Sequence, residues 1–220
     1  IIAGASSYSR LIDYSAMREI ANDVGAFLLV DIAHAAGLIA SKIIPNPIKY
    51  ADIVTFTTHK TLRGVRGGAI LCREDFANSI DRAVMPGVQG GPHMNMVAGK
   101  AATFIAAETK EFKEYSKNIV DSADIMAKEF ISLGCYVISG GTDTHLFVLD
   151  TVKSFEKTGL ECEEILESNG IIVNRNVVPF DNLSPSVSSG IRIGTPYMTS
   201  IGYRKLDFKV VAKKIVNLLK

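Results

Sequence analysis

Two short strand-like segments, the fully apolar run 26–30 and residues 52–57, limit the possible folds of this chain more than any other feature. Continuous apolar runs of this length are typical of strands buried on both faces of a sheet. Residues 1–5 read as a further strand, and a helix is expected between Asp13, which can cap it, and Gly25, which can end it. Buried strands that are separated by helices predict an α/β fold.

A fourth predicted strand, residues 69–72, follows the segment 52–57 after only a short loop. A parallel connection needs a crossover of about a dozen residues or more, usually a helix. We therefore expect this strand to run antiparallel, in a sheet that is mixed but mostly parallel.

The second half of the chain predicts a smaller α/β domain. After the segment 86–92, which is rich in glycine and proline, two apolar stripes at helical spacing run through residues 97–105 and 112–133. A capping box of Thr158 and Glu161 begins a further helix, and a last helix is expected from Asp207. Strands are expected at residues 136–139, 146–150, 171–174 and 191–193. We expect two domains, the C-terminal part of a large cofactor-binding domain at residues 1–112 and a small C-terminal domain at residues 113–220.

The composition is that of an ordinary globular protein, with a formal net charge of +1, 47% hydrophobic residues and 21% charged residues. Nucleic acid is therefore not an expected partner, and no apolar run approaches the ~20 residues that span a bilayer. The three separated cysteines, Cys72, Cys135 and Cys162, indicate a reducing compartment and suggest no particular role. The first residue is not methionine, so we expect the chain to be a fragment.

Asp31 and His34 follow the first apolar segment, at the carboxyl end of its predicted strand. Ligands of open α/β sheets bind at this edge, and an ionised carboxylate there needs a cation or strong donors. The ordinary alternatives are a loop or helix-capping acid for Asp31 and a structural histidine for His34.

The second apolar segment ends in Thr57 and is followed by His59, Lys60 and the glycine-containing segment 63–68. Lysine becomes nucleophilic where burial or nearby cations disfavour its charged form, and His59 and Arg66 are close to Lys60 in sequence. A solvated surface lysine is the ordinary alternative. An amine and an acid on neighbouring strand ends fit pyridoxal 5'-phosphate, which needs an amine for its aldehyde and an anion for its pyridinium nitrogen.

Five motifs extend this pattern along the chain: residues 30–38 (VDIAHAAGL), 57–68 (TTHKTLRGVRGG), 87–92 (GVQGGP), 139–146 (SGGTDTHL) and 189–196 (SGIRIGTP). In this order they resemble serine hydroxymethyltransferase, and the similarity covers essentially all of the chain. The run TTHKTL with its flanking motifs is highly specific. The resemblance implies fold type I of the pyridoxal-phosphate-dependent transferases.

The resemblance implies roles for the residues near the predicted sheet edge. Lys60 would bond the cofactor covalently, and Asp31 would pair with its pyridinium nitrogen. Further residues would contact the cofactor or order the reacting side around the lysine: Ser6, Ala33, His34, Thr57, His59 and Arg66. Arg192 would bind the amino-acid carboxylate through its bidentate fork, and a surface ion pair is the alternative.

The resemblance also implies partners beyond a single chain. Backbone N–H groups of Gly90 and Gly91 would approach the cofactor phosphate of a neighbouring subunit, in a homodimer or homotetramer, and a plain turn is the alternative. The segment that meets the folate cofactor is matched by Asn176, Ser184, Pro185 and Ser186. The family commonly has a bulky aromatic residue in place of Ser186.

The implied activity is the interconversion of serine and glycine, with transfer of the one-carbon unit to tetrahydrofolate as methylene-tetrahydrofolate. We expect a cytoplasmic protein without a resident metal, with the mitochondrion as the alternative location. The N-terminal part of the family's site is not found in this sequence, so a non-catalytic cofactor-binding fragment is one alternative. Another fold-type I aldolase or aminotransferase is a second alternative, and a hydrolase that uses Asp31, His34 and His59 as metal ligands is a third.

Overall fold

The computed structural model describes residues 1–220, and the chain divides into two structural units. The first unit contains residues 1–6 and 12–116, and the second contains residues 7–11 and 117–220. Residues 7–11 therefore belong to the second unit although their neighbours in sequence belong to the first, which no sequence signal indicated. The predicted division into domains 1–112 and 113–220 stays a prediction.

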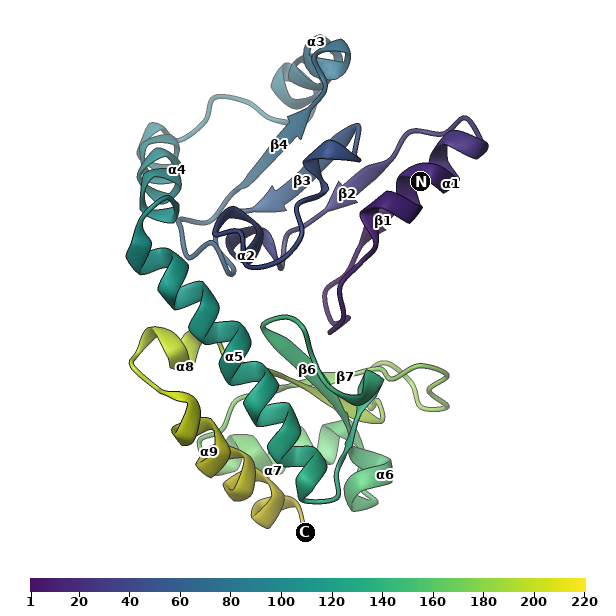
Figure 1. Ribbon diagram of the computed structural model, residues 1–220, viewed down its shortest axis with the longest axis vertical. Coiled ribbons are helices and arrows are strands. Elements are labelled where there is room, and N and C mark those ends of the chain that lie inside the picture. Colours follow the sequence, from purple (N-terminus) through teal and green to yellow (C-terminus); the bar gives the residue numbers. More distant parts are fainter. The chain divides into compact units, whose positions relative to one another are not determined.

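Four strands form the sheet of the first unit, in the order β1 (Ile2–Gly4), β2 (Leu29–Asp31), β3 (Ile53–Thr57) and β4 (Gly68–Cys72) (Figure 1). The first three strands are parallel, and β4 runs antiparallel to β3. The mixed, mostly parallel sheet predicted from the spacing of the apolar segments is thus confirmed, because the β3–β4 connection is too short to contain a crossover helix.

One face of this sheet carries the core of the first unit. Val30 and Val54 pack there with Ala21 of α1 (Tyr14–Asp23) and with residues of α2 (Ala36–Ala40). The side chain of Asp13 accepts from Ala16 N and caps α1, as predicted. The opposite face, where β1, β2 and β3 align Ile2, Leu29 and Ile53, is less covered, since Ile2 is 79% exposed. The expectation of a sheet covered on both faces is therefore met on one face only within this chain.

The remaining helices of the first unit are η1 (Pro47–Lys49), α3 (Glu74–Arg82), the π-helical segment η2 (Ala83–Val88) and α4 (Met94–Ala107). Helix α4 packs closely on the β3–β4 loop, because a Cβ at Gly64 would lie 2.3 Å from the side chain of Thr103. The predicted apolar stripe of α4 remains largely exposed within the chain, and Ile105 is 71% exposed.

The second unit contains an antiparallel sheet in the order β5 (Tyr136–Val137), β6 (Leu146–Asp150), β8 (Gly190–Gly194) and β7 (Asn174–Asn176). The prediction of a strand at residues 171–174 is wrong in position, because the paired residues begin at Asn174. Strand β5 ends two residues earlier than predicted, where the 3-10 turn η3 (Ile138–Gly140) begins.

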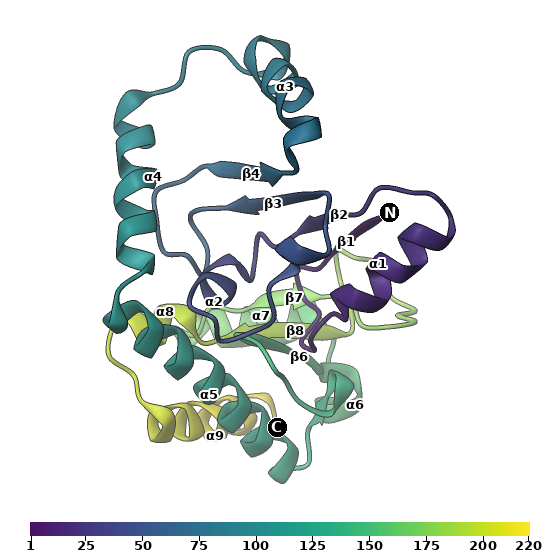
Figure 2. The same cartoon turned by 45° about the horizontal axis from the view of Figure 1, so that its top comes forward.

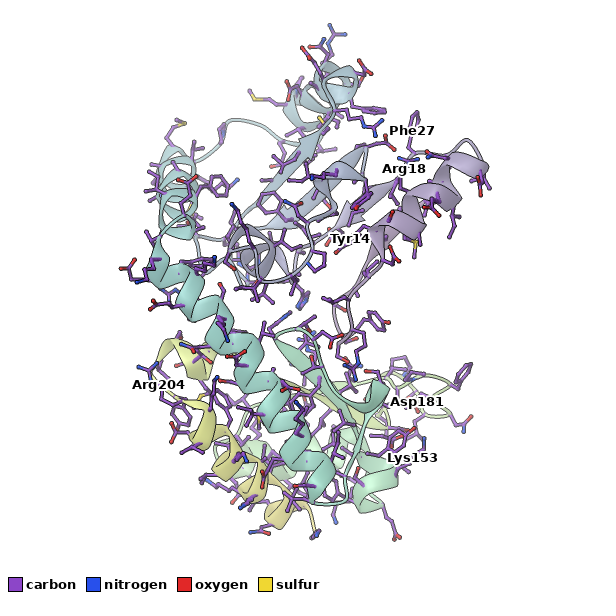
Figure 3. All side chains as sticks on the ribbon, viewed as in Figure 1. Tyr14, Arg18, Phe27, Lys153, Asp181 and Arg204 are labelled. Atoms are coloured by element: carbon purple, nitrogen blue, oxygen red, sulfur yellow. The ribbon has the colours of Figure 1, made fainter.

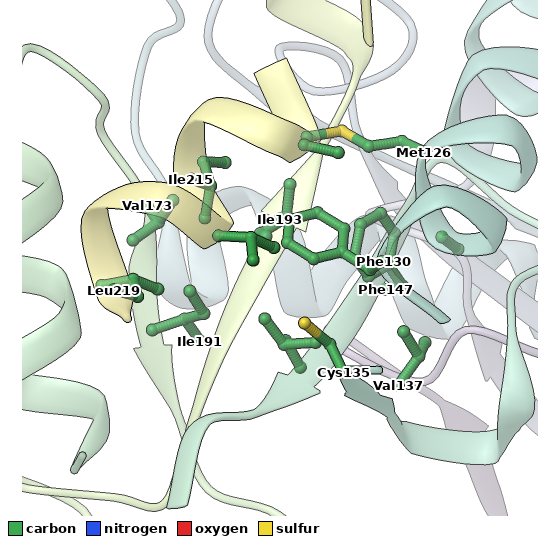
Figure 4. Packing of buried hydrophobic residues seen from close by; sticks show 14 of the residues in the cluster. Met126, Phe130, Cys135, Val137, Phe147, Val173, Ile191, Ile193, Ile215 and Leu219 are labelled. Carbon is green, nitrogen blue, oxygen red and sulfur yellow. The ribbon is translucent and has the colours of Figure 1, made fainter. Parts of the chain in front are cut away.

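The core of the second unit lies between this sheet and three helices: α5 (Lys110–Ser132), α7 (Gly159–Ser168) and α9 (Lys205–Leu219) (Figures 2 and 4). The rings of Phe130 and Phe147, both fully buried, meet with centroids 5.7 Å apart. Full burial of one such side chain stabilises the fold by ~1.5–3 kcal/mol.

Two short helices, α6 (Thr151–Phe155) and α8 (Pro196–Ser200), follow β6 and β8. The predicted capping box is present at the start of α7, where Thr158 and Glu161 each accept from the other's backbone N–H. None of the helices combines the length and the apolar character that crossing a lipid bilayer would require.

Candidate active site

Asp31 and Lys60 lie at the same edge of the first sheet. Asp31 is the last residue of β2, and Lys60 follows the last residue of the neighbouring β3 by three positions. These strands are parallel, so their carboxyl ends meet at one edge, which is where open α/β sheets bind ligands. Ser6 follows the end of β1 at this same edge.

The carboxylate of Asp31 is held by two donors. Its Oδ1 accepts from the backbone N–H of Ala33 at 2.9 Å, and its Oδ2 accepts from Thr55 Oγ1 at 2.6 Å. Asp31 therefore makes the backbone hydrogen bond that is typical of an acid in a loop. It does not cap a helix, because Ala35 occupies the N-cap of α2. A carboxylate has about four lone-pair positions, so Asp31 retains the capacity to accept from a further cationic donor.

Three hydrogen bonds join the segment after β2, which includes the start of α2, to the end of β3 and the loop that follows it. Thr57 Oγ1 donates to Ala33 O at 3.1 Å, and Thr61 Oγ1 donates to His34 O at 2.7 Å. Thr61 Oγ1 also accepts from the N–H of Gly37 at 3.1 Å. These bonds fix the backbone that carries the acid relative to the backbone that carries the lysine.

The loop around Lys60 is itself built on a buried threonine. Thr58 is fully buried, and its Oγ1 donates to Val65 O at 2.6 Å. Its backbone N–H donates to Gly67 O, while its carbonyl accepts from Gly64 N. These bonds fix the main chain on either side of Lys60, and the lysine itself is exposed.

The imidazole of His59 faces the same loop. Its Nδ1 accepts from the N–H of Gly67 at 3.4 Å, which leaves the proton of the neutral ring on Nε2. Arg66 is exposed, and His34 is half-buried in the turn after β2.

Gly90 and Gly91 lie in the segment between η2 and α4. Neither has a positive φ, and a Cβ at either position would meet no atom within 4 Å. Neither a positive φ nor close packing inside this chain therefore requires glycine at these two positions. Both backbones are open to close approach by another molecule.

Arg192 lies in the middle of β8, in the second unit. Its neighbours Ile191 and Ile193 point into the core, so Arg192 points to the opposite face of that sheet. Its Nη2 donates to Asn174 Oδ1 at 3.1 Å. Burial lowers the pKa of its guanidinium, which still remains a cation at physiological pH.

The end of β7 and the loop between β7 and β8 contain the other predicted substrate residues. Asn176, the last residue of β7, donates from Nδ2 to Val177 O at 2.7 Å. Ser184 and Ser186 form a hydrogen bond of 2.9 Å between their hydroxyls, on either side of the exposed Pro185.

Sequence reasoning missed Thr55, Thr61 and Asp181 as residues that organise these sites. Strand alternation is the available signal for Thr55, since it places residues 53, 55 and 57 on one face. Asp31, His34 and His59 do not form a cluster, since no group of three or more His, Cys, Asp and Glu side chains is placed to hold a metal ion.

Comparison with known proteins agrees with the motifs. The model of the family "Serine hydroxymethyltransferase" matches residues 1–215. The serine hydroxymethyltransferase of Mycoplasma mycoides subsp. mycoides SC is 52% identical over 220 residues, which are 100% of this chain and 53% of that protein. The enzyme of the same name from Coprothermobacter proteolyticus is 53% identical over 218 residues, 99% of this chain and 52% of that protein. The chain spans about half the length of these curated relatives, and it belongs to the serine hydroxymethyltransferase family.

Proposed function

We propose that the protein interconverts serine and glycine with the help of pyridoxal 5'-phosphate and passes the one-carbon unit to tetrahydrofolate. The observation that supports this most is the position of Asp31 and Lys60 at one sheet edge, with the carboxylate held by Thr55. The family membership of the chain supports it independently.

The residues at this edge fit pyridoxal 5'-phosphate. Asp31 offers an ionised oxygen with spare lone pairs to a pyridinium N–H, and Lys60 offers an amine to an aldehyde. When bound, the cofactor supplies an electron sink for the bond at the amino-acid Cα that breaks. Ser6 follows β1 at this edge, and Ala33 and His34 follow β2. We assign all three to cofactor contact.

The protein's own groups would then hold and orient the reactants. Lys60, at Nζ, and His59, at Nε2, would carry protons at this edge. Thr57 fixes the turn at Ala33 through its hydroxyl. We assign Arg66 to ordering the loop around the lysine.

Arg192 would bind the carboxylate of serine or glycine, because a planar guanidinium matches a carboxylate through two parallel hydrogen bonds. The half-buried position of Arg192 strengthens such a pair by limiting solvent screening. Asn176, Ser184, Pro185 and Ser186 would contact tetrahydrofolate. The openness of Gly90 and Gly91 supports their approach to the cofactor phosphate of a second subunit, in a homodimer or homotetramer. We assign the protein to the cytoplasm.

The test is a pair of measurements on the protein as the cell makes it, supplied with pyridoxal 5'-phosphate. We expect a visible absorbance band from the bound cofactor that is lost in Lys60→Ala, and serine-dependent formation of methylene-tetrahydrofolate. Lys49→Ala, at an exposed lysine of η1 in the same unit, is the matched control and should retain both signals.

Two results would contradict the proposal in different ways. An unchanged band in Lys60→Ala would show that the amine does not bond the cofactor. A normal band without folate turnover would show a protein that binds the cofactor without this activity.

A further inference from the structure

The loop of residues 177–189, which connects β7 and β8, is organised by one carboxylate. It contains no helix or strand and is mostly exposed. Asp181 lies within it (Figure 3). Its Oδ2 accepts from Val178 N at 3.2 Å and from Ser189 N at 2.8 Å, and its Oδ1 accepts from Leu183 N at 2.9 Å and from Ser189 Oγ at 2.6 Å. Asp181 therefore closes the loop by joining its two ends.

One end of the loop is fixed to the second unit by other bonds. Ser188 O accepts from Gly159 N at 2.7 Å, and Val187 O accepts from Leu160 N at 2.9 Å. Ser189 O accepts from Thr151 N at 2.8 Å. Since residues 187–189 are thus held by the starts of α6 and α7, the carboxylate of Asp181 transfers that fixed position to the exposed part of the loop.

The charge of Asp181 is stable under physiological conditions. Burial acts to raise the pKa of this carboxyl, but the Ser189 hydroxyl and the N–H groups of Leu183, Ser189 and Val178 outweigh it and lower the pKa to about 2. The group is therefore ionised near neutral pH, and bonds to an ionised acceptor are stronger than neutral ones.

The loop holds a conformation that its residues disfavour. Phe180 has a φ of +60° and is 99% exposed, and Ser188 has a φ of +50° while fully buried. A left-handed backbone is uncommon for a bulky residue and persists only where surrounding contacts impose it. The bonds of Asp181, directly after Phe180, are such contacts.

We propose that Asp181 is a positioning residue for the folate substrate. Its carboxylate holds the loop that carries Ser184, Pro185 and Ser186 and that begins after Asn176, and it acts through the loop and does not touch the ligand. This inference rests on the proposed function, because that function assigns the loop to tetrahydrofolate. A purely stabilising role for Asp181 is the competing explanation.

The test compares Asp181→Asn, Ser189→Ala and the control Asp207→Asn in the protein loaded with pyridoxal 5'-phosphate. In Asp181→Asn, the NH2 group opposes the backbone N–H groups of Val178 and Ser189 if it takes the place of Oδ2, and the N–H group of Leu183 if it takes the place of Oδ1. Either orientation loses at least one hydrogen bond of the loop. Ser189→Ala removes only the hydroxyl donor and keeps the backbone bond. Asp207 accepts from Arg204 N at 2.7 Å at the start of α9, so its variant removes a comparable carboxylate elsewhere in the same unit.

The readouts are KM for tetrahydrofolate, KM for serine, and cleavage of 3-phenylserine to glycine and benzaldehyde, which needs no one-carbon acceptor. We expect Asp181→Asn to raise KM for tetrahydrofolate by about tenfold or more, since a small displacement of a binding group is costly. Ser189→Ala should raise it about threefold. The other two readouts should stay within about twofold in all variants, and Asp207→Asn should change none.

Each remaining outcome decides against the inference. An unchanged KM for tetrahydrofolate in Asp181→Asn, or an equal loss in all three readouts, overturns it while leaving the proposed function intact. If Asp181→Asn does not fold, Ser189→Ala decides by the same criteria. A wild-type protein without folate turnover overturns the proposed function and this inference with it.

Discussion

Thr55 donates its hydroxyl hydrogen to Asp31 Oδ2 over 2.6 Å, and the two residues are also register partners across β2 and β3. In-register residues of parallel strands point to the same face, so this bond is set by the sheet itself. A carboxylate that is oriented before the cofactor arrives does not have to be ordered on binding, which favours affinity. Under the proposed function, this bond would make Thr55 a determinant of cofactor affinity without any contact between Thr55 and the cofactor.

Replacing Thr55 by valine should weaken cofactor binding. The change keeps the shape of the side chain and removes the donor to Asp31, which costs about 1.4 kcal/mol, or roughly a tenfold higher Kd for pyridoxal 5'-phosphate. Titration of the visible absorbance band measures this. Thr199→Val is the control, because Thr199 Oγ1 is buried and has no hydrogen-bond partner. Equal Kd values for wild type and Thr55→Val would show that this bond does not orient Asp31 for the cofactor.

Replacing Gly37 by alanine should disturb the lysine loop. A Cβ at Gly37 would lie 2.2 Å from Thr61 O and 2.4 Å from Thr61 C, both backbone atoms that cannot rotate away. We expect a loss of about 1–3 kcal/mol in the free energy of unfolding, together with lower cofactor occupancy at Lys60. Urea denaturation and the absorbance band provide the two measurements.

Gly68→Ala, at the first residue of β4 where the lysine loop ends, is the matched control. Its Cβ would meet only Phe56 O, at 3.4 Å, and its φ is not positive. Equal stability losses in Gly37→Ala and Gly68→Ala would contradict the explanation by close approach to Thr61.

The sheet and the placement of Asp31 and Lys60 at one of its edges could be predicted because both depend on local chemistry. The apolar segments before Asp31 and Lys60 predicted buried parallel strands, and the short connection to β4 predicted its antiparallel direction. The capping box at Thr158 was readable because its two partners are three residues apart.

The features that were missed depend on contacts between distant residues. Ser9 and Arg10 join the second unit through Gly141 O, Ser139 O and Asp143, more than a hundred residues later in the chain. The strand predicted at residues 171–174 was misplaced because the paired residues, 174–176, are decided by the register with β8. No spacing rule identifies such partners in advance.

Asp52→Asn should destabilise the first unit. Asp52 is 4% exposed, pairs with Arg18 at 2.8 Å and with Arg73 at 3.0 Å, and accepts from Leu28 N at 2.7 Å. Arg18 is labelled in Figure 3. Removing one partner of a largely buried ion pair leaves the other charge uncompensated, so we expect a loss of about 2–4 kcal/mol at pH 7. Denaturant unfolding measures this loss. The control is Asp124→Asn, which removes a pair with the exposed Lys128, and we expect it to lose less than about 0.5 kcal/mol.

The pH dependence of this variant follows from the pKa of Asp52. Burial acts to raise it, but the bond from Leu28 N and the charges of Arg18 and Arg73 prevail, so the pKa lies below its ordinary value in the folded state. The stabilisation is therefore present above the ordinary pKa of about 4 and is lost as pH falls through the lower, folded value. The stability difference between wild type and Asp52→Asn should be largest above about pH 4 and shrink below it. A difference that stays constant into acid would contradict the assignment.

Phe180→Asn should stabilise the second unit. Phe180 combines a φ of +60° with 99% exposure, so it gains almost nothing from burial while carrying a backbone conformation that disfavours a bulky side chain. Asparagine tolerates this conformation through its short polar side chain, and we expect a gain of about 1 kcal/mol in the free energy of unfolding. Val88→Asn is the control, because Val88 is 80% exposed without a positive φ and should change stability by less than about 0.5 kcal/mol. Urea denaturation measures both variants. Equal effects of the two substitutions would attribute the gain to lost surface hydrophobicity. A gain confined to Phe180→Asn identifies backbone strain that the bonds of Asp181 hold in place.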